Sequence, residues 1–179
     1  MSHHLPMKKS LRFFTMMEMI TVMVVLGILV TVTMSVASVD STKANSQIIA
    51  GALNFASSYA LGNTSNQDYN NNNRYDSTVR VDITANKVVV TFVNELAGTS
   101  TELNTYNLSK GSHVRQIDST DLGTGTKTLY FSSVGEPLNS DTMTDVVSGN
   151  TEITVSKKSD DDNYIKLYMR AFTGKVTYY

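Results

Sequence analysis

The sequence predicts an α+β protein in which one long N-terminal helix packs on antiparallel β-sheets. Three observations predict this class. An uncharged apolar run extends from Met19 to Val39, a helical apolar period continues from Ile48 to Tyr59, and short strands separated by turns follow from Val79. At 179 residues the chain accommodates one membrane helix and one further domain of about 120 residues.

The first element is a short basic segment, residues 1–13. It contains Lys8, Lys9 and Arg12 and no acidic residue. Positive charge holds a flank on the cytoplasmic side, so the C-terminal remainder is expected to fold outside the cytoplasm. We interpret the segment as a leader that begins at Met1 or at Met7. An ordinary secretory signal is the competing interpretation, but the apolar run is longer than such signals usually have.

Residues 14–39 form the predicted transmembrane helix. At about 1.5 Å per residue, the uncharged run extends roughly 30 Å, which matches the hydrocarbon core of a bilayer. Glu18 is the single charge in this segment. A carboxylate at the edge of an apolar helix either reaches the headgroup region or has a functional partner. The second possibility makes Glu18 a candidate site residue.

Residues 40–61 are predicted to continue the same helix in amphipathic form. Apolar side chains recur at helical spacing along one stripe, which is expected to face the domain: Ile48, Ile49, Ala52, Leu53, Ala56 and Tyr59. Gly62 is expected to end the helix. The sequence therefore predicts one continuous helix from about Phe14 to Ala60.

Residues 62–78 are predicted to form an Asn-rich loop. One interpretation is a solvated loop, since Asn accepts left-handed backbone angles. The other is a calcium loop, because oxygen-bearing side chains recur at alternate positions: Asp68, Asn70, Asn72 and Asp76. Asn73 stands where calcium loops usually have Gly, and Val79 where they have the closing Glu.

Residues 79–179 are predicted to form an antiparallel β domain. The expected strands, separated by turn residues, are 79–83, 87–93, 102–108, 113–117, 127–133, 151–156, 164–171 and 175–179. Lys110-Gly111 predicts a hairpin between the third and fourth strands. The last three strands are expected to form a meander, with a turn over residues 159–163. Together these strands predict sheets that pack on the helix.

The sequence Phe14-Thr15-Met16-Met17-Glu18, followed by the apolar run, resembles the N-terminus of type IV pilins and type II secretion pseudopilins. In that family a prepilin peptidase removes a basic leader before a Phe, and the new N-terminus is usually methylated. A Glu at the fifth mature position then neutralises the amine of a neighbouring subunit. The resemblance implies that Phe14 is the mature N-terminus, Glu18 the assembly carboxylate and Gly27 the common mid-helix glycine.

The sequence departs from the family pattern at two positions. Phe13 precedes the expected cleavage site, where the family has Gly or sometimes Ala. Ser35 stands where many members have a helix-breaking Pro, so the helix is expected to be straighter than in those members.

The C-terminal half carries a second resemblance. Two short phrases match the H-type minor pseudopilins and FimT-like minor pilins, the first in Phe131, Gly135 and Pro137 and the second in Gly174, Lys175 and Val176. This resemblance implies a pilin-like minor subunit that starts or caps a pseudopilus or pilus. It also implies a single-pass inner-membrane location with a periplasmic domain. The implied partners are other pilins or pseudopilins, the prepilin peptidase and the membrane.

Composition disfavours enzymatic and nucleic-acid functions. The chain has no Cys, His113 is the sole His of the β domain, and no nucleophile, phosphate-binding or metalloprotease motif is present. Without residues 1–13, twelve basic residues stand against sixteen acidic ones, a net charge of −4. A FimT-like DNA-capturing pilin, using Lys166, Arg170 and Lys175, is one alternative. An unrelated single-span envelope protein with a ligand-binding β domain is another.

Overall fold

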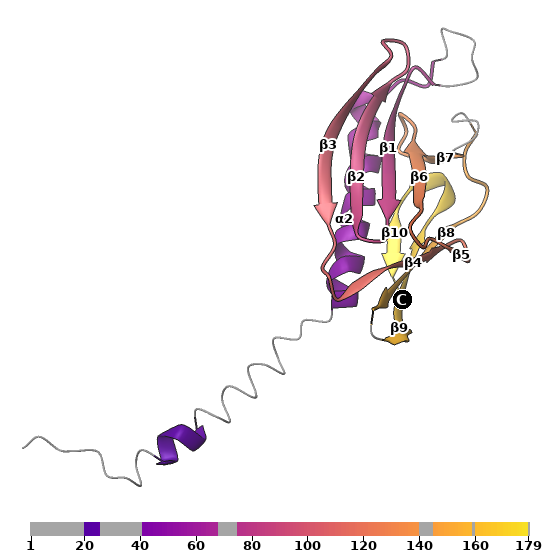
Figure 1. Cartoon of the computed structure of the whole chain (residues 1–179). Helices are drawn as coiled ribbons and strands as arrows, with labels where there is room; N and C mark the ends of the chain where they lie inside the picture. Colours follow the sequence, from indigo (N-terminus) through magenta and orange to yellow (C-terminus); the bar gives the residue numbers. More distant parts are fainter. Residues whose placement is uncertain (1–19, 26–40, 68–74, 140–144, 159, 179) are drawn as a thin grey trace, which may run out of the picture. The chain divides into compact units, whose positions relative to one another are not determined.

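The computed structural model describes residues 20–25, 41–67, 75–139, 145–158 and 160–178 (Figure 1). The chain divides into two compact units, residues 1–39 and 40–179. In the first unit the described residues, 20–25, are helical. Residues 26–40 lie outside the described part, so the continuity of the helix stays a prediction.

The second unit begins with helix α2, Ser41–Asn63. The predicted amphipathic character is confirmed, because Ile49, Ala52, Leu53 and Ala56 are fully buried. The predicted end of the helix is wrong, because Gly62, which was expected to end it, lies inside and the last helical residue is Asn63. The Asn63 side chain donates to the Tyr59 carbonyl at 2.8 Å, and the amide and hydroxyl of Thr64 both donate to that of Ala60. These bonds satisfy carbonyls of the last turn and keep Gly62 within the helix.

Two five-stranded antiparallel sheets follow. Each sheet combines strands from two separate parts of the sequence. The first sheet has the order β3 (Thr99–Asn107), β2 (Lys87–Asn94), β1 (Ser77–Thr84), β6 (Thr126–Phe131) and β7 (Pro137–Leu138). The second has the order β10 (Val176–Tyr178), β9 (Asp160–Met169), β8 (Thr151–Lys157), β4 (Ser112–Ile117) and β5 (Thr120–Asp121). A short 3₁₀ helix, η1 (Ala171–Thr173), joins β9 to β10.

The core lies where α2 meets the inner faces of both sheets. Figure 1 shows α2 running along the strands behind β1, β2 and β3. Alternate residues of β1, Val79, Val81 and Ile83, are fully buried, while the intervening Arg80 and Asp82 are partly exposed. The second sheet contributes buried residues to the same core: Val114, Ile153, Val155, Leu167 and Met169. Period-two alternation therefore gives each of the long central strands one apolar face.

The predicted hairpin of residues 102–108 and 113–117 is wrong. β3 pairs with β2 in the first sheet, whereas β4 pairs with β8 and β5 in the second. The chain passes from the first sheet to the second between β3 and β4. Two backbone hydrogen bonds to the turn between β1 and β2 stabilise this crossing. Leu108 donates its amide to the Asn86 carbonyl and Val114 donates to the Ala85 carbonyl, at 2.9 and 3.1 Å.

The predicted C-terminal meander is confirmed, since β8, β9 and β10 are adjacent and antiparallel. Its first turn is shorter than expected. Lys157 pairs with Asp160, so most of the residues 159–163 expected to form the turn belong to β9 instead.

Candidate functional site

The N-terminal assembly residues predicted from the sequence fall largely outside the described structure. Phe13, Phe14, Glu18 and Gly27 all lie there. Between the last two, residues 20–25 form a helix with about half or more of each large apolar side chain exposed: Ile20, Val22, Met23, Val24 and Val25. Contiguous exposed apolar side chains are typical of surfaces that contact another protein or a membrane. Within the described residues, no helix is long and apolar enough to span a membrane.

The calcium interpretation of the Asn-rich loop also stays a prediction. Asp68, Asn70 and Asn72 lie outside the described residues. Asp76 is described and is buried immediately before β1. Its amide donates to the Gln67 carbonyl at 2.7 Å, and its carbonyl accepts from the Glu95 amide at 2.8 Å. The described part of the chain contains no group of three or more acidic, His or Cys side chains able to hold a metal ion.

The two C-terminal phrases come together at one point beside α2. The Ser57 hydroxyl of α2 donates to the Gly135 carbonyl at 2.9 Å. A Cβ added to Gly174 would lie 2.6 Å from that same carbonyl oxygen and 3.1 Å from Cε1 of Phe131. Both glycines have positive φ, +76° for Gly135 and +60° for Gly174. Pro137 pairs with Phe131 across β6 and β7. These residues therefore form a close-packed corner, which we call the glycine corner.

Polar side chains of α2 fasten the second sheet at two further points, which the sequence analysis missed. Asn45 is fully buried and donates to the Ser112 hydroxyl at 2.7 Å, while its own oxygen accepts from the Ser109 amide at 2.8 Å. Asn54 accepts a longer bond from the Val176 amide, at 3.5 Å. The position of Asn45 could have indicated its burial, because it lies one helical turn before Ile49 on the buried face of α2.

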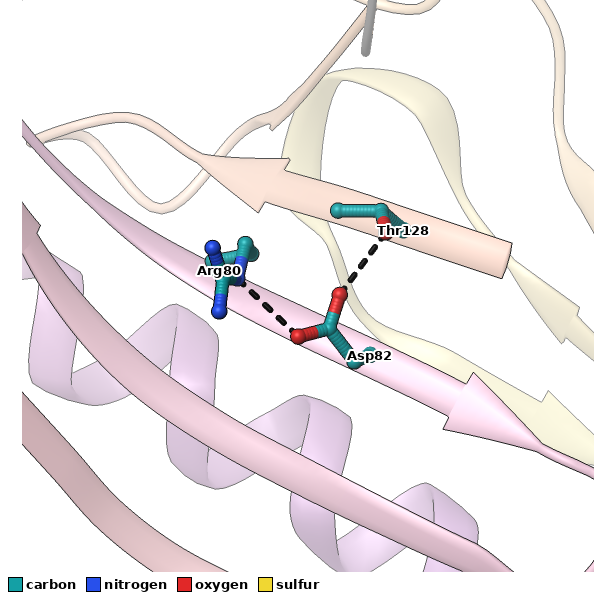
Figure 2. A network of polar contacts seen from close by, with 3 residues as sticks. All are labelled: Arg80, Asp82 and Thr128. Atoms are coloured by element: carbon teal, nitrogen blue, oxygen red, sulfur yellow. Dashed lines mark hydrogen bonds and ion pairs between the residues drawn. The ribbon is translucent and has the colours of Figure 1, made fainter. Parts of the chain in front are cut away.

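A polar network lies on the outer face of the first sheet (Figure 2). Arg80 and Asp82 are two apart on β1, so both point away from the core, and Arg80 Nε lies 3.0 Å from Asp82 Oδ2. Thr128 of β6, directly opposite Asp82, donates its hydroxyl to Oδ1 at 2.7 Å. The network couples two central strands. It contains neither a nucleophile with a base nor a set of metal ligands.

The three basic residues considered for DNA capture do not form a row of free cations. Lys166 Nζ lies 2.7 Å from Glu152 Oε1 on the neighbouring strand. This hydrogen bond from Lys166 lowers the pKa of the Glu152 carboxyl, and the same bond raises the pKa of the Lys166 ammonium. Arg170 and Lys175 are exposed. A phosphate backbone is bound best by clustered unpaired cations, and here one of the three is neutralised.

Comparison with protein-family models, with curated proteins and with solved structures finds no match.

Proposed function

We propose that this chain is a minor pilin or pseudopilin, a structural subunit that initiates or caps a type II secretion pseudopilus or type IV pilus. In this role it supports protein secretion or pilus biogenesis. The observation that carries the proposal is the sequence from Phe14 to Glu18 at the head of an uncharged apolar run. The fold supports it, because an amphipathic helix follows and lays its apolar stripe on two antiparallel sheets.

Assembly proceeds through the N-terminal helix. After cleavage between Phe13 and Phe14, the helix carries an ammonium at its first residue and a carboxylate at its fifth. Either charge alone is strongly unfavourable within lipid or a bundle of apolar helices, whereas a hydrogen-bonded pair is tolerated. Glu18 therefore pairs with the Phe14 ammonium of a neighbouring subunit. The apolar side chains around it, including those exposed over residues 20–25, pack between subunits.

The β domain is the head of the subunit on the periplasmic side of the inner membrane. The basic leader remains cytoplasmic until the prepilin peptidase removes it. Its partners in this scheme are the peptidase, the membrane and the neighbouring subunits. The domain needs no cofactor for this work.

The Glu18→Gln substitution tests the assembly step. It keeps the side-chain volume and removes the charge, so insertion into the membrane is expected to be unchanged. Incorporation into filaments is expected to fall by at least about tenfold, since breaking a buried pair leaves the partner charge uncompensated. The readout is the ratio of subunit in sheared filaments to subunit in the membrane fraction.

Glu136→Gln is the matched control. This residue lies in the β domain, and within the described residues it forms no ion pair. It is expected to leave the ratio unchanged. Equal incorporation of Glu18→Gln and the wild type would contradict the proposal and favour a single-span envelope protein that acts through its β domain.

A further inference from the structure

Two adjoining hollows lie at the end of the second sheet, where β9 leads through η1 into β10. One has a volume of about 530 Å³ and includes Phe172 and Thr173 of the η1 turn in its wall. The other, of about 370 Å³, is lined by Tyr168 and Thr177, which face each other across β9 and β10. Asn150 and Arg170 line both, so the two hollows adjoin at these side chains, and we call them together the Arg170–Phe172 groove. The volume of each hollow lies in the range of small ligand sites.

The guanidinium of Arg170 is available to bind a ligand in this groove. Arg170 is exposed, and its side chain takes part in no ion pair among the described residues. The nearby carboxylate of Glu152 is already bonded to Lys166. Asn150 accepts a hydrogen bond from the Ala171 amide at 3.2 Å, which occupies its oxygen and leaves its NH₂ group as a donor. None of the described residues that line the groove is acidic, so the groove offers donors that no lining carboxylate neutralises.

An exposed aromatic side chain lines the same hollow as this cation. Phe172 is 67% exposed, the most exposed large apolar side chain of the described β domain. Its turn is held in place because Gly174 donates its amide to the Arg170 carbonyl and Arg170 donates to the Lys175 carbonyl, both at 3.0 Å. An exposed aromatic and an arginine on an ordered turn are the residue types that anchor protein interfaces. Preorganisation lowers the entropic cost of binding.

We propose that the Arg170–Phe172 groove binds an acidic segment of another protein, with a carboxylate on Arg170 and an adjacent apolar side chain on Phe172. The guanidinium fork matches a carboxylate bidentately, and Asn150 supplies a further donor. A nucleic-acid backbone fits less well, because it requires a series of free cations and Lys166 is paired. The proposal concerns the β domain alone and stands whether or not the N-terminal helix assembles.

The test is a peptide titration of the full chain in detergent micelles, followed by NMR of ¹⁵N-labelled backbone amides and of the arginine Nε–H groups. The probe is N-acetyl-Leu-Asp-Leu-amide, and the matched probe replaces Asp by Asn. The Asp peptide is expected to shift the signals of Arg170, Ala171, Phe172 and Thr173 in a saturable way. The Asn peptide is expected to bind at least about tenfold more weakly, because the bond to a charged group is lost.

Two variants separate the groove from general positive charge. Arg170→Gln is expected to weaken the Asp peptide by at least about tenfold. Lys157→Gln removes one exposed positive charge at the other end of β8 and is expected to change the affinity by less than about twofold. Phe172→Ala is expected to weaken both peptides, since the apolar contact is common to them.

Three results would overturn the proposal. The first is the absence of saturable shifts at about 10 mM Asp peptide, which corresponds to less than about 3 kcal/mol of binding free energy. The second is equal affinity for the Asp and Asn peptides, or for Arg170→Gln and the unaltered chain. The third is tighter binding of sodium glucuronate to the same amides, which would assign the groove to a carboxylated sugar.

Discussion

At the contacts between α2 and the sheets, individual polar residues form hydrogen bonds and glycines allow close packing. Asn45 is the clearest case, because it is fully buried and bonds to both Ser109 and Ser112. The Asn45 side-chain amide supplies hydrogen-bond partners to the segment in which the chain crosses from one sheet to the other. A buried amide is stable only when its groups are paired in this way. Asn45 therefore ties α2 to the segment between β3 and β4, together with the backbone bonds of Leu108 and Val114.

Gly174 gives a sharp prediction at this scale. The Gly174→Ala substitution combines a positive φ of +60° with a Cβ only 2.6 Å from the Gly135 carbonyl oxygen, so the backbone must shift. We expect it to lower the free energy of unfolding by about 3 kcal/mol, the sum of left-handed strain and overpacking. Urea unfolding of the full chain in detergent micelles, monitored by the tyrosine signal, measures this change.

Gly98→Ala is the control for Gly174→Ala. Gly98 has nearly the same φ, +63°, but a Cβ there would meet no atom within 4 Å. Its cost is expected to be about 1 kcal/mol, from left-handed strain alone. If the two variants unfold at the same urea concentration, the close approach at the glycine corner does not contribute to the free energy of unfolding, and the prediction is wrong.

The sequence predicted some of these residues and missed others for physical reasons. The apolar stripe of α2 follows from periodicity, which is local. Asn45 was missed because the value of a buried amide depends on partners more than sixty residues away. Gly135 and Gly174 were singled out as turn residues and by family resemblance, but their steric role could be seen only in the fold.

At the scale of elements, sheet membership was harder to predict than strand positions. The strands were expected close to where they lie, since alternation and turn residues are encoded locally. Lys110-Gly111 resembles a hairpin turn, yet the strands on either side join different sheets. Which strands pair depends on which neighbours bury the apolar face of each strand. The β8–β9 hairpin was predicted correctly because both of its strands bury an apolar face against the same core.

The ion pair across β8 and β9 makes folding stability depend on pH. The pKa of Glu152 is lowered in the folded state by Lys166, so its contribution is present above the unfolded value of about 4.3 and is lost as pH falls through the folded value. The pKa of Lys166 is raised, so its contribution is present below about 10.4 and is lost as pH rises further. The pair therefore stabilises the fold between these limits.

Glu152→Gln tests this dependence. We expect a small decrease in Tm at pH 7, because the pair is partly exposed, and no difference from wild type once the carboxyl is protonated in both states. Thermal unfolding at a series of pH values between 3 and 9 provides the measurement, with Glu136→Gln as the variant that lacks an ion-pair partner within the described residues. A decrease in Tm that is the same at every pH would contradict the assignment.

At the scale of the whole molecule, two parts of opposite character share one chain. The β domain buries its apolar side chains against α2, whereas the described N-terminal residues 20–25 leave theirs exposed. The proposed function places the first part in an apolar environment and the second in an aqueous one. A subunit that first resides in a membrane and then stacks in a filament meets both requirements.

The most direct test of the proposed function is mass spectrometry of the N-terminus of the protein recovered from its native membrane. Processing by a prepilin peptidase predicts a chain that begins at N-methylated Phe14, with Phe13 tolerated before the cut. A chain that begins at Met1 or Met7 would contradict it, because Glu18 would then have no free amine nearby to pair with. A chain that begins near Asp40 would also contradict it and would indicate an ordinary secreted β domain.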